Sequence, residues 1–565
     1  MEIVLSLLNP FPYISMPSTL VGWLGWFISF ALFILLIWRG WEGASAYKLK
    51  TWVIFFIFAI LTPFTTWLIG VRLLTGSGTV EATLNSAVTS PALMLFTTLP
   101  WVLAGGILGP GYAAILGAFS GLLLGLYETH NLFSLIEIGI IAFLFSKAVR
   151  QLYRTRMFGF IRHPIGAAVM LMVLQIPLLI LTSFFAVNGP LASRLDFSFT
   201  QTWPMILTRS IELLIGGMIG EILYQMRKDI WGVQGELIPS PSETNLQLRF
   251  LYGSVPYILV LVFVLIITDW VVAVRASRNM VEEQLANASL VASDSLPFFF
   301  ETGQDLILTY ATEDLVQMAP EDLSRTLATR YKSVKFFSQL FVFRADGTPI
   351  LGFPSNDINL LNLSSQEKAG MAMAQQGRLI QVFTVPPRLN GLPADVSFMA
   401  AIRDSQGNVK GILLGRSDLT SNHFTNPAIR SMQSVAQLGG EGMILDENQT
   451  ILYHTNSALI MQPYYGSVED NEKLYNDISS TGENLLAFYR KVPDSTWSIL
   501  LAVPAEQSQE VAMNIAVPLL LMIIVIGAIA FVGLRFALRG VLSTINSLGD
   551  EALRIANGQL DHELV

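Results

Sequence analysis

The chain has 565 residues, of which 52% are hydrophobic and only 13% charged, whereas soluble domains carry about 25% charged residues. A soluble protein is therefore excluded, and the net charge of -8 without a basic stripe argues against nucleic acid as a partner. Cysteine is absent and only five histidines occur, so we expect no disulfide, no thiolate chemistry, no metal site and no cofactor.

Nine apolar stretches approach or exceed the length needed to cross a hydrocarbon core of about 30 Å. Seven lie within residues 1–247, which we expect to form a helical membrane bundle. The eighth, 252–273, and the ninth, 514–536, flank a polar segment of soluble character. The first seven stretches are 18–38, 52–74, 89–108, 112–127, 132–149, 165–187 and 203–226.

Basic residues concentrate in alternate loops, as expected for loops that face the cytoplasm. This pattern predicts a multi-pass protein of the inner (plasma) membrane, with its N-terminus outside and its C-terminus in the cytoplasm. The residues that carry the prediction are Arg39, Lys48 and Lys50, then Lys147, Arg150, Arg154, Arg156 and Arg162, then Arg227, Lys228 and Arg249.

Small residues recur at four-residue spacing in the bundle, a pattern that lets helix backbones approach closely. The clearest run is Gly117, Gly121 and Gly125 in the fourth stretch, and two glycine pairs begin at Gly105 and Gly216. The glycine-rich stretch 105–122 resembles the hairpin of the five-helix receptor module in lytic-regulation sensor kinases. It is also similar to the substrate-capture subunits of vitamin importers.

Ionisable residues at membrane depth are costly and are usually functional or paired. Glu137, Arg209 and Glu212 are predicted at similar depth, and Arg72 ends the second stretch near that level. Together they can line an outward-facing polar pocket for a small ligand. Alternatively, Glu137 and Arg209 form an ion pair that holds the bundle together.

The polar segment 275–509 begins with an apolar helical stripe of Val281, Leu285, Ala288 and Ala292. Such a helix can pair with its twin in a homodimer, can pack on its own domain, or can do both.

The strand signals that follow occur in two similar groups. The first has strands at 339–344 and 348–353, a helix at 366–376, and strands at 379–385, 396–403 and 410–418, which predicts one curved antiparallel sheet. Strands at 442–454, 484–492 and 497–504 repeat this outline. A long helix followed by two such modules resembles the double Cache family of extracellular sensor domains. The resemblance implies two PAS-like modules, distal 314–419 and proximal 430–505, with small metabolites bound in the distal one.

Strand alternation places Arg416 and Asp418 on one face of the last distal strand, and Arg403 ends the strand before it. An acid and two bases converging there can bind the ammonium and carboxylate of an amino-acid-like ligand. Amino-acid-binding Cache domains place an acid near Asp418, but their Arg-x-Trp-Tyr run is missing, so the resemblance does not imply an amino-acid receptor. Alternatively, the three residues form ordinary strand-end salt bridges. Four aromatic residues are expected in the core: Phe341, Phe343, Phe383 and Phe398.

After the ninth stretch, a heptad seam suits a parallel coiled coil. It consists of Val541, Ile545, Leu548, Ala552 and Ile555. With Gly558 and Leu560, residues 537–565 resemble the start of a HAMP relay, although Gly540-Val541 stands where that family usually has proline. The second HAMP helix does not follow, so either the sequence is part of a longer protein, which we favour, or the natural protein has lost its output. The alternative to a HAMP start is a short juxtamembrane helix.

Together these patterns predict an α+β membrane protein: a polytopic helical bundle, an extracellular tandem PAS-like domain and a cytoplasmic coiled-coil stub. The function that we expect is a homodimeric signal-transduction receptor for a small extracellular ligand. Its HAMP relay would serve an output that can be a two-component histidine kinase, a cyclase or a phosphatase. The alternative is a transporter or solute-capture protein. No catalytic motif occurs, so we expect no enzyme activity in this chain.

Overall fold

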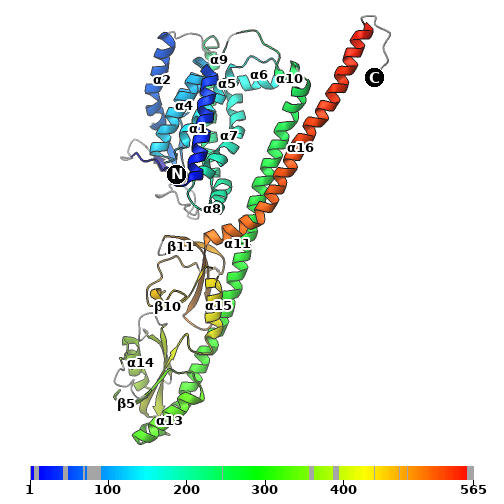
Figure 1. Ribbon diagram of the computed structural model, residues 1–565. Helices are drawn as coiled ribbons and strands as arrows, with labels where there is room; N and C mark the ends of the chain where they lie inside the picture. Colours follow the sequence, from blue (N-terminus) through cyan, green and yellow to red (C-terminus); the bar gives the residue numbers. More distant parts are fainter. Residues whose placement is uncertain are drawn as a thin grey trace. The chain divides into compact units, whose positions relative to one another are not determined.

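The computed structural model describes residues 2–4, 12–41, 49–67, 70–72, 91–354, 362–385 and 394–556, except positions 234, 245, 379, 438, 470, 480 and 481 (Figure 1). The chain divides into two compact units. The first contains Met1–Arg275 with Gln509–Val565, and the second contains Ala276–Ser508.

The described residues contain six helices whose length and composition allow them to cross a membrane. Four are whole helices, and two are segments of longer ones that continue into the second unit. They are α1 (Leu20–Trp41), α2 (Leu49–Trp67), α4 (Pro110–Tyr127), α7 (Pro164–Ala186), α11 (Leu246–Tyr310) and α16 (Ala505–Ala556).

Two further long helices correspond to expected spans but are less apolar. They are α5 (Ser134–Arg150) and α9 (Trp203–Met226), which carry the charged residues Glu137, Arg209 and Glu212. Short elements complete the connections in this unit: α6 (Arg156–Arg162), α8 (Leu191–Asp196), the π-helix η2 (Phe197–Gln201) and α10 (Pro241–Thr244).

The third expected span, 89–108, is not a continuous helix. It consists of the strand β3 (Ala92–Met94), a turn, and the nine-residue helix α3 (Leu99–Ile107). At 1.5 Å per residue, α3 is about 14 Å long, too short to cross a bilayer alone. Pro100 lies in the first turn of α3, where its missing N–H costs no helical hydrogen bond. A proline alone does not break a helix in this unit, since α2 and α7 continue through Pro63 and Pro177. β3 pairs with β2 (Gly70–Arg72), which pairs with β1 (Glu2–Val4).

The close helix contact predicted from glycine spacing is confirmed between α4 and α5. A Cβ added at Gly121 would lie 2.3 Å from the carbonyl oxygen of Ser134, and one at Gly117 would lie 2.5 Å from the Cβ of Ala142. No side chain fits at these two positions without moving the neighbouring helix.

The second unit contains two antiparallel five-stranded sheets. The first has the order β5-β4-β8-β7-β6, with one face covered by α14 (Ser365–Gln375). The predicted order of two strands, a helix and three strands is thus confirmed. The strands are β4 (Gln339–Arg344), β5 (Pro349–Phe353), β6 (Ile380–Val385), β7 (Asp395–Arg403) and β8 (Val409–Asp418).

The second sheet has the order β10-β9-β13-β12-β11 and follows α15 (Asn426–Gln437). Its strand β11 is the one that the sequence patterns missed. The strands are β9 (Glu441–Leu445), β10 (Ile451–His454), β11 (Tyr475–Ile478), β12 (Asn484–Lys491) and β13 (Ser498–Pro504). The remaining short helices of this unit are α12 (Asp314–Gln317), α13 (Pro320–Ser333) and η4 (Ser457–Leu459).

One hydrophobic cluster joins the part of α11 in this unit to both sheets, and includes Val281, Leu285 and Ala292 of the predicted stripe (Figure 1). The stripe therefore packs on its own domain. Phe398 belongs to the same cluster, and Phe341 and Phe343 are buried under α14, so their core positions are confirmed. The side chain of Phe383 lies outside the described residues.

Candidate functional site

Arg416 is buried, and its guanidinium is held by a carboxylate from α14. Its Nη2 lies 2.6 Å from Oε2 of Glu367, and its Nε donates to Oε1 of the same residue at 2.8 Å. Further bonds go to the carbonyl oxygen of Asn362 at 3.0 Å and to Oε1 of Gln339 at 3.4 Å. This two-point contact is the geometry that suits an arginine and a carboxylate best.

Glu367 also begins the helix that covers the sheet. Ser364 and Glu367 form a capping box, in which the Ser364 hydroxyl accepts from the Glu367 N–H and the Glu367 carboxylate accepts from the Ser364 N–H. Ser397 of β7 donates to the same carboxylate at 2.5 Å. One fully buried acid thus connects α14 to β7 and β8, and Arg416 contributes to structure.

Arg403 and Asp418 lie at opposite ends of the β7–β8 pair. In the register, Asp395 faces Asp418 and Arg403 faces Val409. With β7 nine residues long, the two ends are about 27 Å apart. The expected convergence of Arg403, Arg416 and Asp418 is therefore wrong, because antiparallel pairing carries the end of β7 away from the end of β8.

Each of the two terminal residues has local partners. Arg403 donates from Nη2 to the carbonyl oxygen of Gly377, just after α14. Asp418 accepts from the backbone N–H of Thr420 at 2.8 Å and from its hydroxyl at 2.9 Å. The salt bridge expected as the alternative is therefore formed by Arg416 alone, with Glu367 as partner.

The pairing of Asp395 with Asp418 gives this end of the sheet two acids on adjacent strands. Sequence reasoning missed Asp395 and Glu367. The Ser-x-x-Glu spacing at 364–367 was the available signal for Glu367, and the β7–β8 register was needed to place Asp395.

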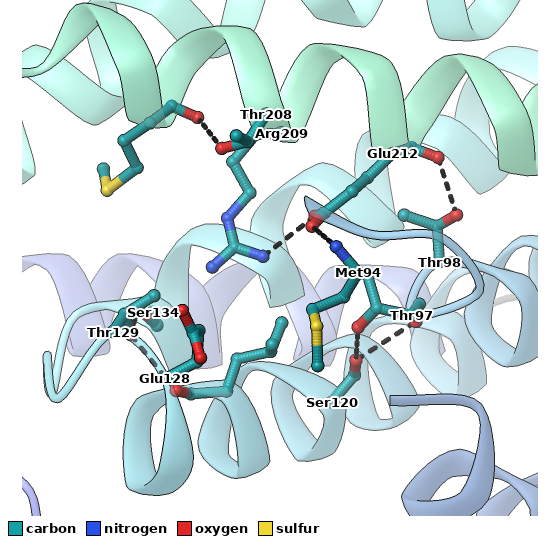
Figure 2. A network of polar contacts seen from close by, with 12 residues as sticks. Met94, Thr97, Thr98, Ser120, Glu128, Thr129, Ser134, Thr208, Arg209 and Glu212 are labelled. Atoms are coloured by element: carbon teal, nitrogen blue, oxygen red, sulfur yellow. Dashed lines mark hydrogen bonds and ion pairs between the residues drawn. The ribbon is translucent and has the colours of Figure 1, made fainter. Parts of the chain in front are cut away.

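The second candidate cluster lies in the bundle (Figure 2). Arg209 pairs with Glu212, with Nη1 3.0 Å from Oε2, and Oε1 of Glu212 accepts from the backbone N–H of Met94 at 2.8 Å. Glu128 likewise accepts from the N–H of Ala92 at 3.1 Å. These carboxylates satisfy backbone donors that β3 exposes where the third span is not helical. The side chain of Arg72 lies outside the described residues.

Glu137 is not paired with Arg209 in the structure. One carboxylate oxygen, Oε1, accepts from the hydroxyl of Thr182 at 2.5 Å, while Oε2 has no partner among the described residues. A cavity of about 30 Å³ adjoins it. Its lining includes Thr97, Thr98, Trp101, Gln175, Arg209 and Glu212.

A larger cavity of about 700 Å³ adjoins the amino end of α4. Arg39, Lys147 and Arg150 contribute its cationic side chains, and Leu144 and Phe158 are among its apolar lining residues. Arg150 also donates to the carbonyl oxygen of Gly106 at 2.9 Å, and so caps the end of α3.

Comparison with known families identifies the second unit. Residues 268–512 match the family model described as Cache domain. The second unit, Ala276–Ser508, lies wholly within this match and is called the Cache domain below. No curated protein matches the chain.

Solved structures were also compared. One is the ligand-binding domain of the Pseudomonas aeruginosa PAO1 amino acid chemoreceptor PctC in complex with GABA. It is 15% identical to this chain, and the match covers 40% of this chain and 99% of that domain, with a TM-score of 0.31. The periplasmic sensory domain of the Campylobacter jejuni chemoreceptor Tlp1 is 13% identical and covers 41% and 98%, with a TM-score of 0.33. The ligand-binding domain of the Pseudomonas fluorescens chemoreceptor CtaA with L-isoleucine is 15% identical and covers 42% and 97%, with a TM-score of 0.31.

Proposed function

We propose that the protein is a transmembrane receptor whose Cache domain binds a small extracellular ligand. The observation that carries this proposal is the position of the Cache match. Its first residue, 268, falls within the membrane-capable segment of α11, and its last, 512, falls within that of α16. The Cache domain therefore lies in the chain between two helices that can cross a membrane, and it continues directly into both. A change of conformation in the domain can act on these helices.

The ligand that we propose carries an ammonium or another small cationic group. Asp395 and Asp418 face each other across β7 and β8, and the nearby Arg416 is neutralised by Glu367. An ammonium group placed between the two carboxylates would form charge-assisted hydrogen bonds with both.

The signal would pass through α16 to a cytoplasmic output. α16 continues without a break to Ala556 and contains the whole heptad seam, while Gly558 and Leu560 lie outside the described residues. In a homodimer, two such helices can form a parallel coiled coil with two alternative packings. A ligand that binds one of the two receptor states more tightly shifts the equilibrium toward the packing of that state. A HAMP relay and an output domain beyond residue 565 complete the proposal.

The experiment is a ligand screen on the purified protein in lipid nanodiscs. Thermal unfolding of the Cache domain is followed with amines, amino acids and uncharged metabolites, and a cationic ligand should raise the midpoint. The Asp418→Asn variant should lose this shift. The Asp404→Asn variant removes an acid at the opposite end of the β7–β8 pair, and should keep the shift. A shift retained in Asp418→Asn would rule out this site, and a screen without hits among cationic compounds would rule out the ligand class.

The interrupted third span favours one alternative, a transporter. Transporters build solute sites from broken helices whose ends meet at mid-membrane, and the β3–α3 break lies beside Arg209 and Glu212. Reconstituted vesicles would show solute accumulation that Arg209→Met abolishes. Vesicles that bind ligand at the Cache domain but accumulate nothing would favour the receptor.

A further inference from the structure

Glu137 of α5 is the one carboxylate lining the small bundle cavity that has an oxygen without a partner in the described structure. The residue is 2% exposed, and Oε2 has no hydrogen-bond partner. A carboxylate buried without a partner is unfavourable in a protein and more so within a membrane, where ionisable groups are usually functional.

The surrounding charges leave Glu137 uncompensated. The only other charged residues that line the cavity are Arg209 and Glu212 of α9, and they pair with each other. The polar residues from α3, α7 and the turn before α3 are neutral: Thr97, Thr98, Trp101, Gln175 and Thr182.

The size of the cavity limits what can bind there. A volume of about 30 Å³ holds one or two water molecules or one small ion, and is too small for a metabolite. Trp101 lines the same space, and its buried Nε1 has no hydrogen-bond partner within the described part of the chain. A water molecule can accept from this N–H and donate to Oε2, but water alone leaves one net negative charge in place.

We propose that this cavity binds a single monovalent cation at Glu137, either a proton or a sodium ion. A proton would bind Oε2 directly and leave a neutral acid beside the water. A sodium ion would use Oε2, the water and hydroxyl or carbonyl oxygens of the lining. Either occupant neutralises the excess charge next to the turn between β3 and α3, and so stabilises the interrupted span.

This site is independent of the Cache ligand, because all its residues belong to the first unit. A ligand screen without hits would therefore not contradict the cation site. The cation site rests only on the part of the proposed function that places the bundle in a membrane. It also replaces the metabolite pocket that the sequence predicts at Glu137, Arg209 and Glu212.

The experiment uses the whole protein in nanodiscs of neutral lipid. In the sodium arm, thermal unfolding is followed while NaCl replaces choline chloride at constant ionic strength and pH. In the proton arm, infrared difference spectra are recorded without sodium while the pH is changed, and the carbonyl band of a protonated carboxylic acid is followed. Each arm includes the isosteric variant Glu137→Gln.

A sodium site predicts an unfolding midpoint that rises with NaCl in the wild type and not in Glu137→Gln. The Glu221→Gln variant is the control: it removes a buried carboxylate of α9 that lies 3.1 Å from His163 and does not line the cavity, and it should retain the sodium response. A proton site predicts an acid band that disappears on deprotonation and is absent from Glu137→Gln. If Glu137→Gln matches the wild type in both arms, the proposal is overturned.

A second variant covers the case in which Glu137→Gln does not fold. Thr182→Val removes the hydroxyl that donates to Oε1 and leaves the carboxylate intact. Losing this donor changes how strongly the carboxylate binds either cation, so the deprotonation midpoint and the sodium concentration for half-maximal stabilisation should both differ from the wild type. No sodium response and no shift of the deprotonation midpoint would overturn the proposal as well.

Discussion

Arg416 illustrates how a predicted ligand residue can instead serve the fold. Strand alternation correctly indicates that it shares a face of β8 with Leu414. It does not indicate what covers that face, because the partner, Glu367, lies 49 residues away on a helix. A contact of this range depends on how α14 packs on the sheet, which the local pattern does not contain.

Breaking this pair should strongly destabilise the Cache domain. Glu367→Met or Arg416→Met leaves one buried charge without its partner, and we expect each to cost about 3–5 kcal/mol. The double variant Glu367→Met/Arg416→Met should cost much less than the sum of the two. Chemical unfolding of the three variants measures this, and strictly additive costs would contradict the structural role.

Glu441 should make the Cache domain sensitive to acid. His454 Nε2 lies 3.6 Å from its carboxylate and holds the pKa of Glu441 below its usual value. Because the pKa of Glu441 is lower in the folded state, its ionised carboxylate stabilises the fold. This contribution is complete above the pKa of the unfolded state, about 4.3, and is lost as the pH falls through the pKa of the folded state. Glu441→Gln should therefore show a smaller loss of thermal stability between about pH 6 and pH 3. An identical loss in wild type and variant would exclude this contribution.

At the scale of elements, the two sheets were the most predictable part of the molecule. Alternating apolar residues predicted the strands at 339–344, 348–353, 379–385, 396–403 and 410–418, and the structure contains a strand at each of these places. β11 was missed because it is only four residues long and follows an irregular polar stretch. Short edge strands depend on their neighbour for pairing, so their own sequence indicates them weakly.

Hydropathy could not detect the break in the third span. The stretch 89–108 is apolar throughout, yet its backbone is strand, turn and short helix. Pro91 and Pro100 were the available signals, but whether a proline kinks or interrupts a span depends on partners for the freed backbone groups. Here those partners are Glu128, just after the end of α4, and Glu212 of α9.

The α4–α5 contact gives a prediction for helix packing. Gly121→Val would place side-chain atoms against the backbone at Ser134, so we expect a loss of about 1–3 kcal/mol or more and a lower thermal midpoint in detergent. Gly533→Val is the matched control, because nothing lies within 4 Å of a Cβ added there on α16. Equal effects of the two substitutions would argue against close packing at Gly121.

At the scale of the whole molecule, the sequence predicted a helical membrane bundle and a separate domain with two sheets. The structure divides into two compact units. The orientation across the membrane stays a prediction, because it rests on the distribution of basic loops and on no contact within the structure. The absence of cysteine makes it directly testable.

Single cysteines should report this orientation without a background signal. Asp446→Cys, in the turn before β10, should react with a membrane-impermeant maleimide in intact cells. Thr544→Cys, on the exposed surface of α16, should react only after the cells are opened. Labelling of both positions in intact cells, or of neither, would contradict the proposed topology.

The shared carboxylate of Glu367 has an evolutionary consequence. One acid starts α14, anchors Arg416 and accepts from Ser397, so no member of this set can be exchanged independently. When homologous sequences are aligned, positions 364, 367, 397 and 416 should covary as a group, with apolar replacements arriving together. Lineages that keep arginine at 416 but have lost the acid at 367 should supply a compensating acid from another position.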